Sequence, residues 1–187
     1  AIAAATVSFA FEENTTPKAI ALKAIEMSKT LKSKVEGESW QSWDMYECVA
    51  NEMENKVKEI IKLVEEKGFD AIDDIVKLAS KDFFADGAET LILAIAAFVM
   101  SNGEFSLCME ICRKMLRDCD SSGAVAGGIC GAFCGILKIP QEWITLVETC
   151  NQEKTMFDYA KEMENIIVKN NDKTYCNAVS IKTLANS

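Results

Sequence analysis

Two carboxylates and two hydroxyls stand together in the segment Asp118-Cys119-Asp120-Ser121-Ser122. Side chains two positions apart in a regular helix diverge by about 200°, because the α-helix has about 3.6 residues per turn. Asp118 and Asp120 therefore converge only if they lie in the turn before a helix, where Ser121 adds a hydroxyl. Carboxylate and hydroxyl oxygens suit Mg²⁺ or Mn²⁺ rather than Zn²⁺. The segment is thus a candidate site for a hard divalent cation.

Three alternatives compete with a cation site at this segment. Asp118, Asp120, Ser122 and Gly123 match the start of an EF-hand loop, but its twelfth position is Ile129 instead of a bidentate Glu. The glycines that follow do not have the G-x-G-x-x-G spacing of a dinucleotide site, and no strand precedes them. Asp and Ser are also preferred helix N-caps. Helix capping is therefore the alternative that remains open.

A helix rich in small residues follows the acidic segment. Glycines at 123, 127, 131 and 135 recur every four residues and form one stripe along a helix. Each glycine costs about 0.8–1.0 kcal/mol relative to Ala in a helix interior. Close approach of neighbouring helix backbones would offset that cost. We therefore expect a deeply buried helix that extends to Leu137.

The composition bounds the fold and excludes several functions. The chain has 187 residues, of which 49% are hydrophobic, and its formal net charge is −9. This length suits one domain with a sizeable core, and the acidity argues against direct nucleic-acid binding. The sequence contains no histidine, which excludes Ser-His-Asp and Cys-His catalysis.

The cysteines fit buried, reduced residues better than ligands or disulfides. The chain has 8 cysteines, and the pairs Cys108/Cys112 and Cys130/Cys134 are each four residues apart without any Cys-x-x-Cys motif. Cysteines on apolar helix faces behave as small hydrophobes. Reduced thiols favour an intracellular location, in the cytoplasm or the nucleus.

The hydrophobic periodicity is helical nearly everywhere, so the sequence predicts an all-α fold. Thr16 and Pro17 are expected to cap and begin a helix whose inner side carries Ile20, Leu22, Ile25 and Met27. Gly68 should end a long amphipathic helix. The predicted helices span residues 18–32, 44–67, 70–81, 88–100, 104–116 and 156–168. The glycine helix after the acidic turn and a further helix that begins near Pro140 complete the set.

One domain is predicted over residues 1–169, followed by a polar tail over residues 170–187. The apolar stretch of residues 88–100 is too short for the roughly 20 residues of a membrane span, so it is expected to be a central buried helix. Neither a membrane association nor an oligomer is expected. The apolar start, Ala1 to Phe11, is read as a core helix entered midway, so an N-terminal part is expected to be absent from this chain.

The stretch from Asp118 to Trp143 resembles the C-terminal signature of the ADP-ribosylglycohydrolase family. The usual form is Gly-Gly-Asp-x-Asp-Thr, a small-residue helix with Ala-Gly-x-x-x-Gly, and a later Ile/Val-Pro-x-x-Trp. Here Asp118-x-Asp120-Ser121 precedes the glycine helix, and Ile139-Pro140 and Trp143 follow it. The family includes ADP-ribosyl-acceptor hydrolases, dinitrogenase reductase-activating glycohydrolase and jellyfish lens crystallins. The resemblance is strongest to the branch that cleaves poly(ADP-ribose) and O-linked ADP-ribose.

Weaker similarity extends upstream. The stretch from Ala88-Glu89-Thr90 to Phe98 resembles the family's Glu-Ser-Val-Pro helix, and Ala1 to Lys32 resembles the segment after its glycine-rich loop. The resemblance implies the C-terminal half of a compact orthogonal all-α bundle that uses two Mg²⁺ ions. It implies that Asp118, Asp120 and Ser121 are metal ligands, with Ser121 in place of the usual Thr. The partner would be an ADP-ribosylated protein or poly(ADP-ribose).

The chain also departs from the family pattern. The two glycines before the motif are Leu116-Arg117 here, and the Pro expected after Glu89-Thr90 is missing. The other metal ligands, the acidic catalytic residue and the glycine-rich loop do not occur in this chain, so no catalytic residue is predicted. These differences imply an incomplete or inactive hydrolase. The alternative is a non-catalytic relative that binds ADP-ribose or serves as a crystallin-like structural protein.

Overall fold

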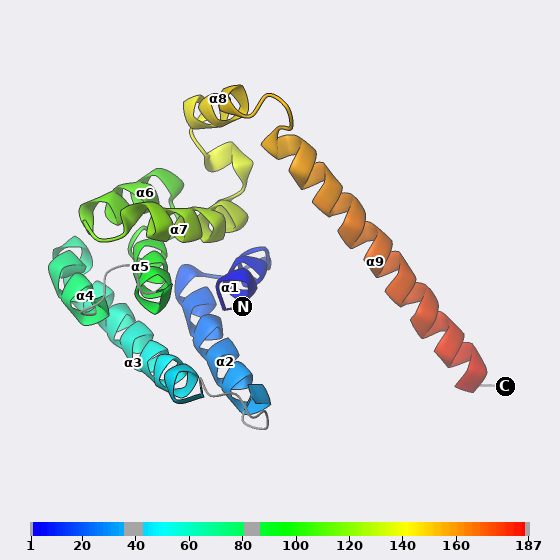
Figure 1. Ribbon diagram of the computed structural model, residues 1–187, viewed down its shortest axis with the longest axis horizontal. Coiled ribbons are helices and arrows are strands. Elements are labelled where there is room, and N and C mark those ends of the chain that lie inside the picture. Colours follow the sequence, from blue (N-terminus) through cyan, green and yellow to red (C-terminus); the bar gives the residue numbers. More distant parts are fainter. Residues whose placement is uncertain (1, 36–42, 81–86, 186–187) are drawn as a thin grey trace. The chain divides into compact units, whose positions relative to one another are not determined.

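The computed structural model describes residues 2–35, 43–80 and 87–185, and every regular element in these ranges is a helix (Figure 1). This confirms the predicted all-α class. The helices are α1 (Ile2–Ala10), α2 (Pro17–Val35), α3 (Trp43–Lys67), α4 (Ile72–Ala79), α5 (Gly87–Met100), α6 (Phe105–Lys114), α7 (Cys119–Cys134), α8 (Gln141–Cys150) and α9 (Met156–Ala185), with short 3₁₀ turns η1 (Gly68–Ala71) and η2 (Ile136–Lys138).

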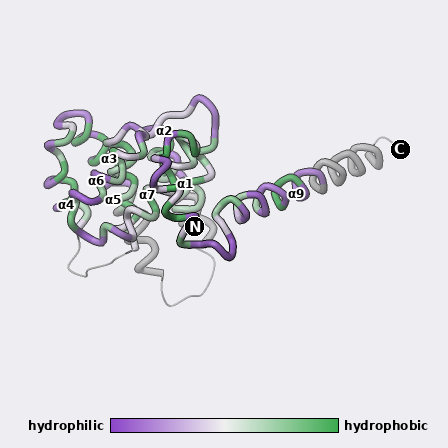
Figure 2. The backbone as a smooth tube through the Cα atoms, turned by 90° about the horizontal axis from the view of Figure 1, so that it is seen from above, coloured by the Kyte–Doolittle hydropathy of each residue, from purple (hydrophilic) through white to green (hydrophobic). Residues whose placement is uncertain are grey.

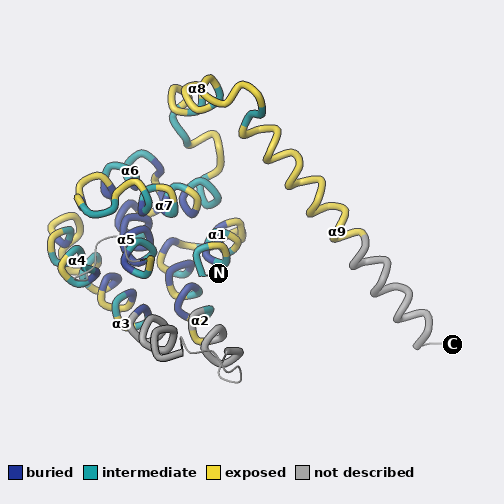
Figure 3. Tube along the Cα trace, viewed as in Figure 1, coloured by how far each residue is buried: buried dark blue, intermediate teal, exposed yellow. Residues whose placement is uncertain are grey.

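The chain divides into two compact units, Ala1–Ile139 and Pro140–Ser187. Helix α5 forms the core of the first unit, where it contacts α2, α3, α4, α6 and α7. All seven residues from Ile92 to Phe98 are buried, and Figure 3 shows most of α5 as buried. The sequence correctly predicted this apolar segment to be a central helix. The ring of Phe98 meets the ring of Phe133 from α7 edge-on at 5.4 Å.

The predicted start of α2 and the predicted end of α3 are confirmed. The hydroxyl of Thr16 accepts a hydrogen bond from the backbone N–H of Ala19 at 3.2 Å, and Pro17 is the first residue of α2. Gly68 follows the last residue of α3 and has a φ of +55°. These caps are local, so the sequence alone specifies them.

The inner face of α2 differs from the predicted one. Leu22 is 42% exposed, whereas Ala21 and Ala24 are buried together with Ile20 and Ile25. Small side chains face the core at this point because α2 packs against α1, α3 and α5. The prediction that Leu22 points inward was therefore wrong.

Helix α7 is only partly buried. Ser122, Ala126, Ile129 and Cys130 face the interior, whereas the opposite side is half-buried or exposed, as at Gly128. The helix ends at Cys134 instead of Leu137, because Gly135 has a φ of +76° and breaks the helical path. The expected deep burial is therefore wrong for this helix.

The glycine stripe of α7 does not serve a close backbone approach. A β-carbon at Gly123 or Gly135 would meet no atom within 4 Å. At Gly127 and Gly131 it would make ordinary contacts of 3.7–3.8 Å with side chains only. The close approach occurs instead at Gly103, between α5 and α6, where the φ is +76° and a β-carbon would lie 2.3 Å from Phe133.

The second unit contains α8 and α9. Helix α9 runs to Ala185, beyond the predicted end at Val168, because no Gly or Pro interrupts this part of the sequence. Figure 2 shows apolar and polar residues alternating along its described part, as an amphipathic helix requires. The predicted limits of a domain at 1–169 and a tail at 170–187 stay a prediction.

Within the described ranges, no helix has both the length and the apolar composition that a membrane crossing requires.

Candidate functional site

The acidic segment begins in the turn between α6 and α7 at Asp118 and continues into the first turn of α7. Met115 ends α6 with its N–H bonded to the carbonyl of Ile111 at 3.1 Å, and its side chain is buried. Leu116 then takes a left-handed conformation with a φ of +53°. The carbonyl of Asp118 accepts bonds from both the N–H and the hydroxyl of Ser122, at 3.0 and 2.9 Å. These contacts fix the backbone on either side of the turn.

The carboxyl group of Asp118 does not cap α7. Asp118 occupies the N-cap position, but its side chain makes no capping hydrogen bond. In α6, by contrast, both carboxylate oxygens of the N-cap residue Glu104 accept backbone N–H bonds, at 3.0 and 2.7 Å. Capping therefore does not account for the side chain of Asp118.

The carboxyl groups of Asp118 and Asp120 lie together instead. A hydrogen bond from Asp118 is the largest cause that holds the pKa of the Asp120 carboxyl below its ordinary value, and the backbone N–H groups of Asp120 and Ser121 add to it. A bond between two carboxyl groups requires one shared proton, which a cation can replace. Asp118 precedes α7, whereas Asp120 lies in the first turn of α7 and not in the turn before the helix where the sequence analysis placed it. Ser121 follows in the same turn and is half-buried.

A partly buried ion pair joins this turn to the core helix α5. The guanidinium of Arg117 donates two bonds to the carboxylate of Glu89, from Nε to Oε1 at 2.6 Å and from a terminal nitrogen to Oε2 at 3.1 Å. Glu89 is 2% exposed and lies in the first turn of α5. The sequence prediction missed this pair, because its members are 28 positions apart and no local pattern links them.

The donor set fits a hard cation in part. Two adjacent carboxylates and a nearby hydroxyl are oxygen ligands of the kind that Mg²⁺ prefers. Within the part of the chain that the structure describes, no group of three or more His, Cys, Asp or Glu side chains is placed to hold a metal ion. Asp118, Asp120 and Ser121 would therefore supply only part of a coordination shell.

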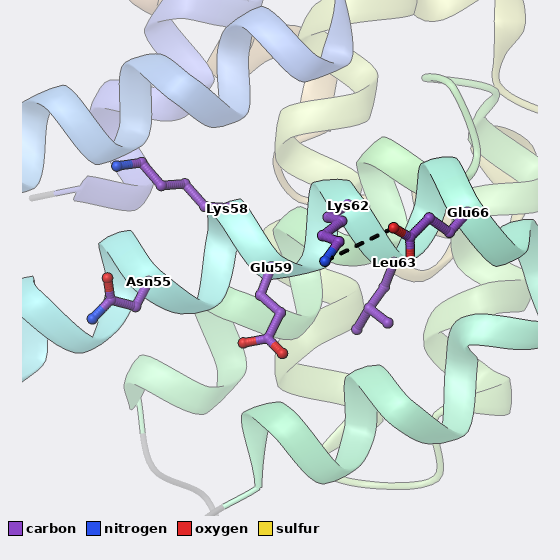
Figure 4. Close-up of a pocket in the computed structure, with 6 residues that line it drawn as sticks. All are labelled: Asn55, Lys58, Glu59, Lys62, Leu63 and Glu66. Atoms are coloured by element: carbon purple, nitrogen blue, oxygen red, sulfur yellow. Dashed lines mark ion pairs between the residues drawn. The ribbon is translucent and has the colours of Figure 1, made fainter.

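A second candidate is the pocket along α3, which has a volume of about 510 Å³ (Figure 4). Both lysines that line it form ion pairs with glutamates of the same helix: Lys58 with Glu54 at 2.6 Å, and Lys62 with Glu66 at 3.9 Å. Such pairs are typical of a solvated helix face. The pocket is lined by Asn55, Lys58, Glu59, Lys62, Leu63 and Glu66.

A third candidate is the thiol cluster between α6 and α7, made of Cys108, Cys112 and Cys130. All three are free and buried, and the thiol of Cys108 hydrogen-bonds with the other two. Cys130 also donates to the carbonyl of Gly103 at 3.2 Å. The bond with Cys108, followed by burial, raises the pKa of both Cys112 and Cys130. The cluster therefore behaves as the buried, reduced packing that the sequence predicted.

Comparison with known proteins gives one family. A family model described as ADP-ribosylglycohydrolase matches residues 1–173. No curated protein and no solved structure matches the chain. The match covers both the core helix α5 and the acidic turn before α7.

Proposed function

Because the chain belongs to the ADP-ribosylglycohydrolase family, we propose that it takes part in Mg²⁺-dependent hydrolysis of the glycosidic bond between ADP-ribose and its acceptor. The acceptor would be a modified protein or poly(ADP-ribose). The observation that carries the proposal is the contact between the carboxyl groups of Asp118 and Asp120 at the start of α7, where the side chain of Asp118 makes no capping hydrogen bond.

Asp118, Asp120 and the hydroxyl of Ser121 would bind the cation. When bound, Mg²⁺ polarises substrate oxygens and activates a water for attack at the glycosidic carbon. The chain's own contribution is to hold two carboxylates at one point, on a turn fixed by Ser122 and by the Arg117–Glu89 pair. Further ligands and the acid–base group would come from outside the described residues.

Calorimetry with Mg²⁺ and ADP-ribose tests the proposal. We expect ADP-ribose to bind in the presence of Mg²⁺, and we expect Asp118→Asn and Asp120→Asn to abolish the Mg²⁺-dependent part. Asp73→Asn is a matched control, because Asp73 is an exposed acid in the first turn of α4. Binding that is absent, or that is unchanged in both site variants, contradicts the metal site. Release of ADP-ribose from modified serine or arginine would then identify the acceptor.

The second candidate is a relative that binds ADP-ribose, or has a structural role, without cleaving the bond. Leu116 and Arg117 favour this candidate, because they stand directly before Asp118 where the resembling family motif has two glycines. The same calorimetry separates the two candidates once an activity assay is added. Mg²⁺-dependent binding without release of ADP-ribose supports the second.

A further inference from the structure

We propose that Arg117 is a positioning residue for the cation site. Its bond to Glu89 holds the backbone that precedes Asp118 in place relative to the core helix α5. This inference rests on the proposed function, since it concerns the same carboxylates. Arg117 directly precedes Asp118, so the direction of the Arg117 side chain and the backbone of Asp118 are coupled by one peptide unit.

The first support is the geometry of the pair. Two parallel bonds of 2.6 and 3.1 Å hold the planar guanidinium in one orientation relative to the carboxylate. A single ammonium group would not impose that orientation, because it acts as a rotatable point charge. The two bonds therefore fix the position and orientation of the Arg117 side chain, in addition to neutralising its charge.

The second support is the rigidity of the anchor. Glu89 is 2% exposed and belongs to α5, whose residues from Ile92 to Phe98 are all buried. The turn itself is more open, since Leu116 is 81% exposed. A buried anchor on the core helix thus holds an exposed turn in place.

The third support is the backbone that links the ion pair of Arg117 to the carboxyl group of Asp118. The carbonyl of Arg117 accepts the N–H of Cys119 at 2.7 Å, so the peptide on each side of Asp118 has a fixed direction. The carboxyl of Asp118 then faces Asp120 instead of the helix N–H groups. Groups that orient metal ligands commonly contribute 10- to 100-fold, by the order of magnitude, to metal affinity.

A charge-neutral double variant tests the inference with Mn²⁺ as the probe. Glu89→Met with Arg117→Met removes one charge of each sign, so the net charge near the site is unchanged. Apolar replacement of a whole buried pair is usually tolerated. The matched control is Glu110→Met with Arg113→Met, because Arg113 forms the same fork with Glu110 on the surface of α6, at 2.9 and 2.7 Å. Mn²⁺ binding is measured from the selective broadening of the backbone amide signals of residues 118–122.

The expected result is Mn²⁺ affinity about tenfold weaker in the Glu89/Arg117 variant and unchanged in the Glu110/Arg113 variant. Arg117→Lys should weaken binding as well, although it keeps the charge and the folded spectrum. Wild-type affinity in both Arg117 variants, or tighter binding, overturns the positioning role. Absence of selective broadening in the wild-type chain overturns the proposed cation site itself, which is a different failure.

Discussion

The ring of Phe133 occupies the space that a side chain on Gly103 would need. A β-carbon on Gly103 would lie 2.3 Å from Cε1 of Phe133, and the φ of Gly103 is +76°. Phe133 also packs edge-on against Phe98 of the core helix. The turn between α5 and α6 therefore requires a glycine both for its conformation and for its packing.

Replacement of Gly103 by Ala should lower the free energy of unfolding by about 2–4 kcal/mol, from the strained φ and the overpacked ring together. Gly123→Ala is the matched control, because a β-carbon there meets no atom within 4 Å. It should raise the free energy of unfolding by up to about 1 kcal/mol through helix propensity. Urea denaturation measures both, and equal effects of the two changes would contradict this account.

Leu116→Gly should stabilise the folded chain. Leu116 has a φ of +53° and is 81% exposed, so its side chain adds strain and little burial. The left-handed conformation costs a non-glycine residue about 1–2 kcal/mol, and glycine loses about 0.5–1 kcal/mol in backbone entropy. The net gain should be about 0.5–1 kcal/mol, measured by urea denaturation.

Leu137→Gly provides the comparison for this change. Leu137 is 96% exposed, and it is not among the described residues with a positive φ. The same loss of a leucine side chain should therefore destabilise the chain or leave its stability unchanged. Stabilisation of equal size at both positions would show that the conformation of Leu116 is not the cause.

The sequence predicted what local contacts determine. Thr16 and Pro17 begin α2 and Gly68 ends α3, because caps depend on neighbouring residues. Such features need no knowledge of the rest of the fold. The sequence placed both Asp118 and Asp120 in a turn before the helix, whereas α7 begins at Cys119 and already includes Asp120 in its first turn.

The sequence could not predict what depends on distant partners. Leu22 faces outward because the packing of other helices around α2 selects its alanines for the core. The bond between Glu89 and Arg117 crosses 28 positions, and the one available signal was an Arg where the resembling motif has a glycine. The stripe on α7 was misread because four glycines in register do not reveal which of them contacts a neighbour.

Thiol alkylation should distinguish two classes of cysteine. Cys119 and Cys150 are exposed, whereas the cluster of Cys108, Cys112 and Cys130 is buried. Hydrogen bonds from Cys112 and Cys130 lower the pKa of the Cys108 thiol, whereas the pKa of Cys112 and Cys130 is raised. Burial of all three side chains, and not their pKa, therefore keeps the reagent away. Site-resolved mass spectrometry after brief iodoacetamide treatment should find the exposed pair modified and the cluster unmodified until urea is added. Early modification of the cluster would contradict the packing of α6 against α7.

The titration of Asp120 should report its contact with Asp118. The folded pKa of Asp120 lies below the ordinary value of 3.8, with the hydrogen bond from Asp118 as the largest cause. The folded chain therefore holds this proton less tightly than the unfolded chain. The resulting stability is fully present above the unfolded pKa and is lost as the pH falls through the folded pKa.

Two measurements test this dependence of stability on pH. The difference in unfolding free energy between the wild type and Asp120→Asn should shrink as the pH falls below about 4. In Asp118→Ala, carboxyl NMR should show the pKa of Asp120 rising toward its ordinary value, because the largest cause of the shift is gone. Asp73→Ala, on α4, should leave the titration of Asp120 unchanged. A pKa of Asp120 that is unaltered in Asp118→Ala would mean that the two carboxyl groups do not meet in solution, and the basis for a shared cation would be lost.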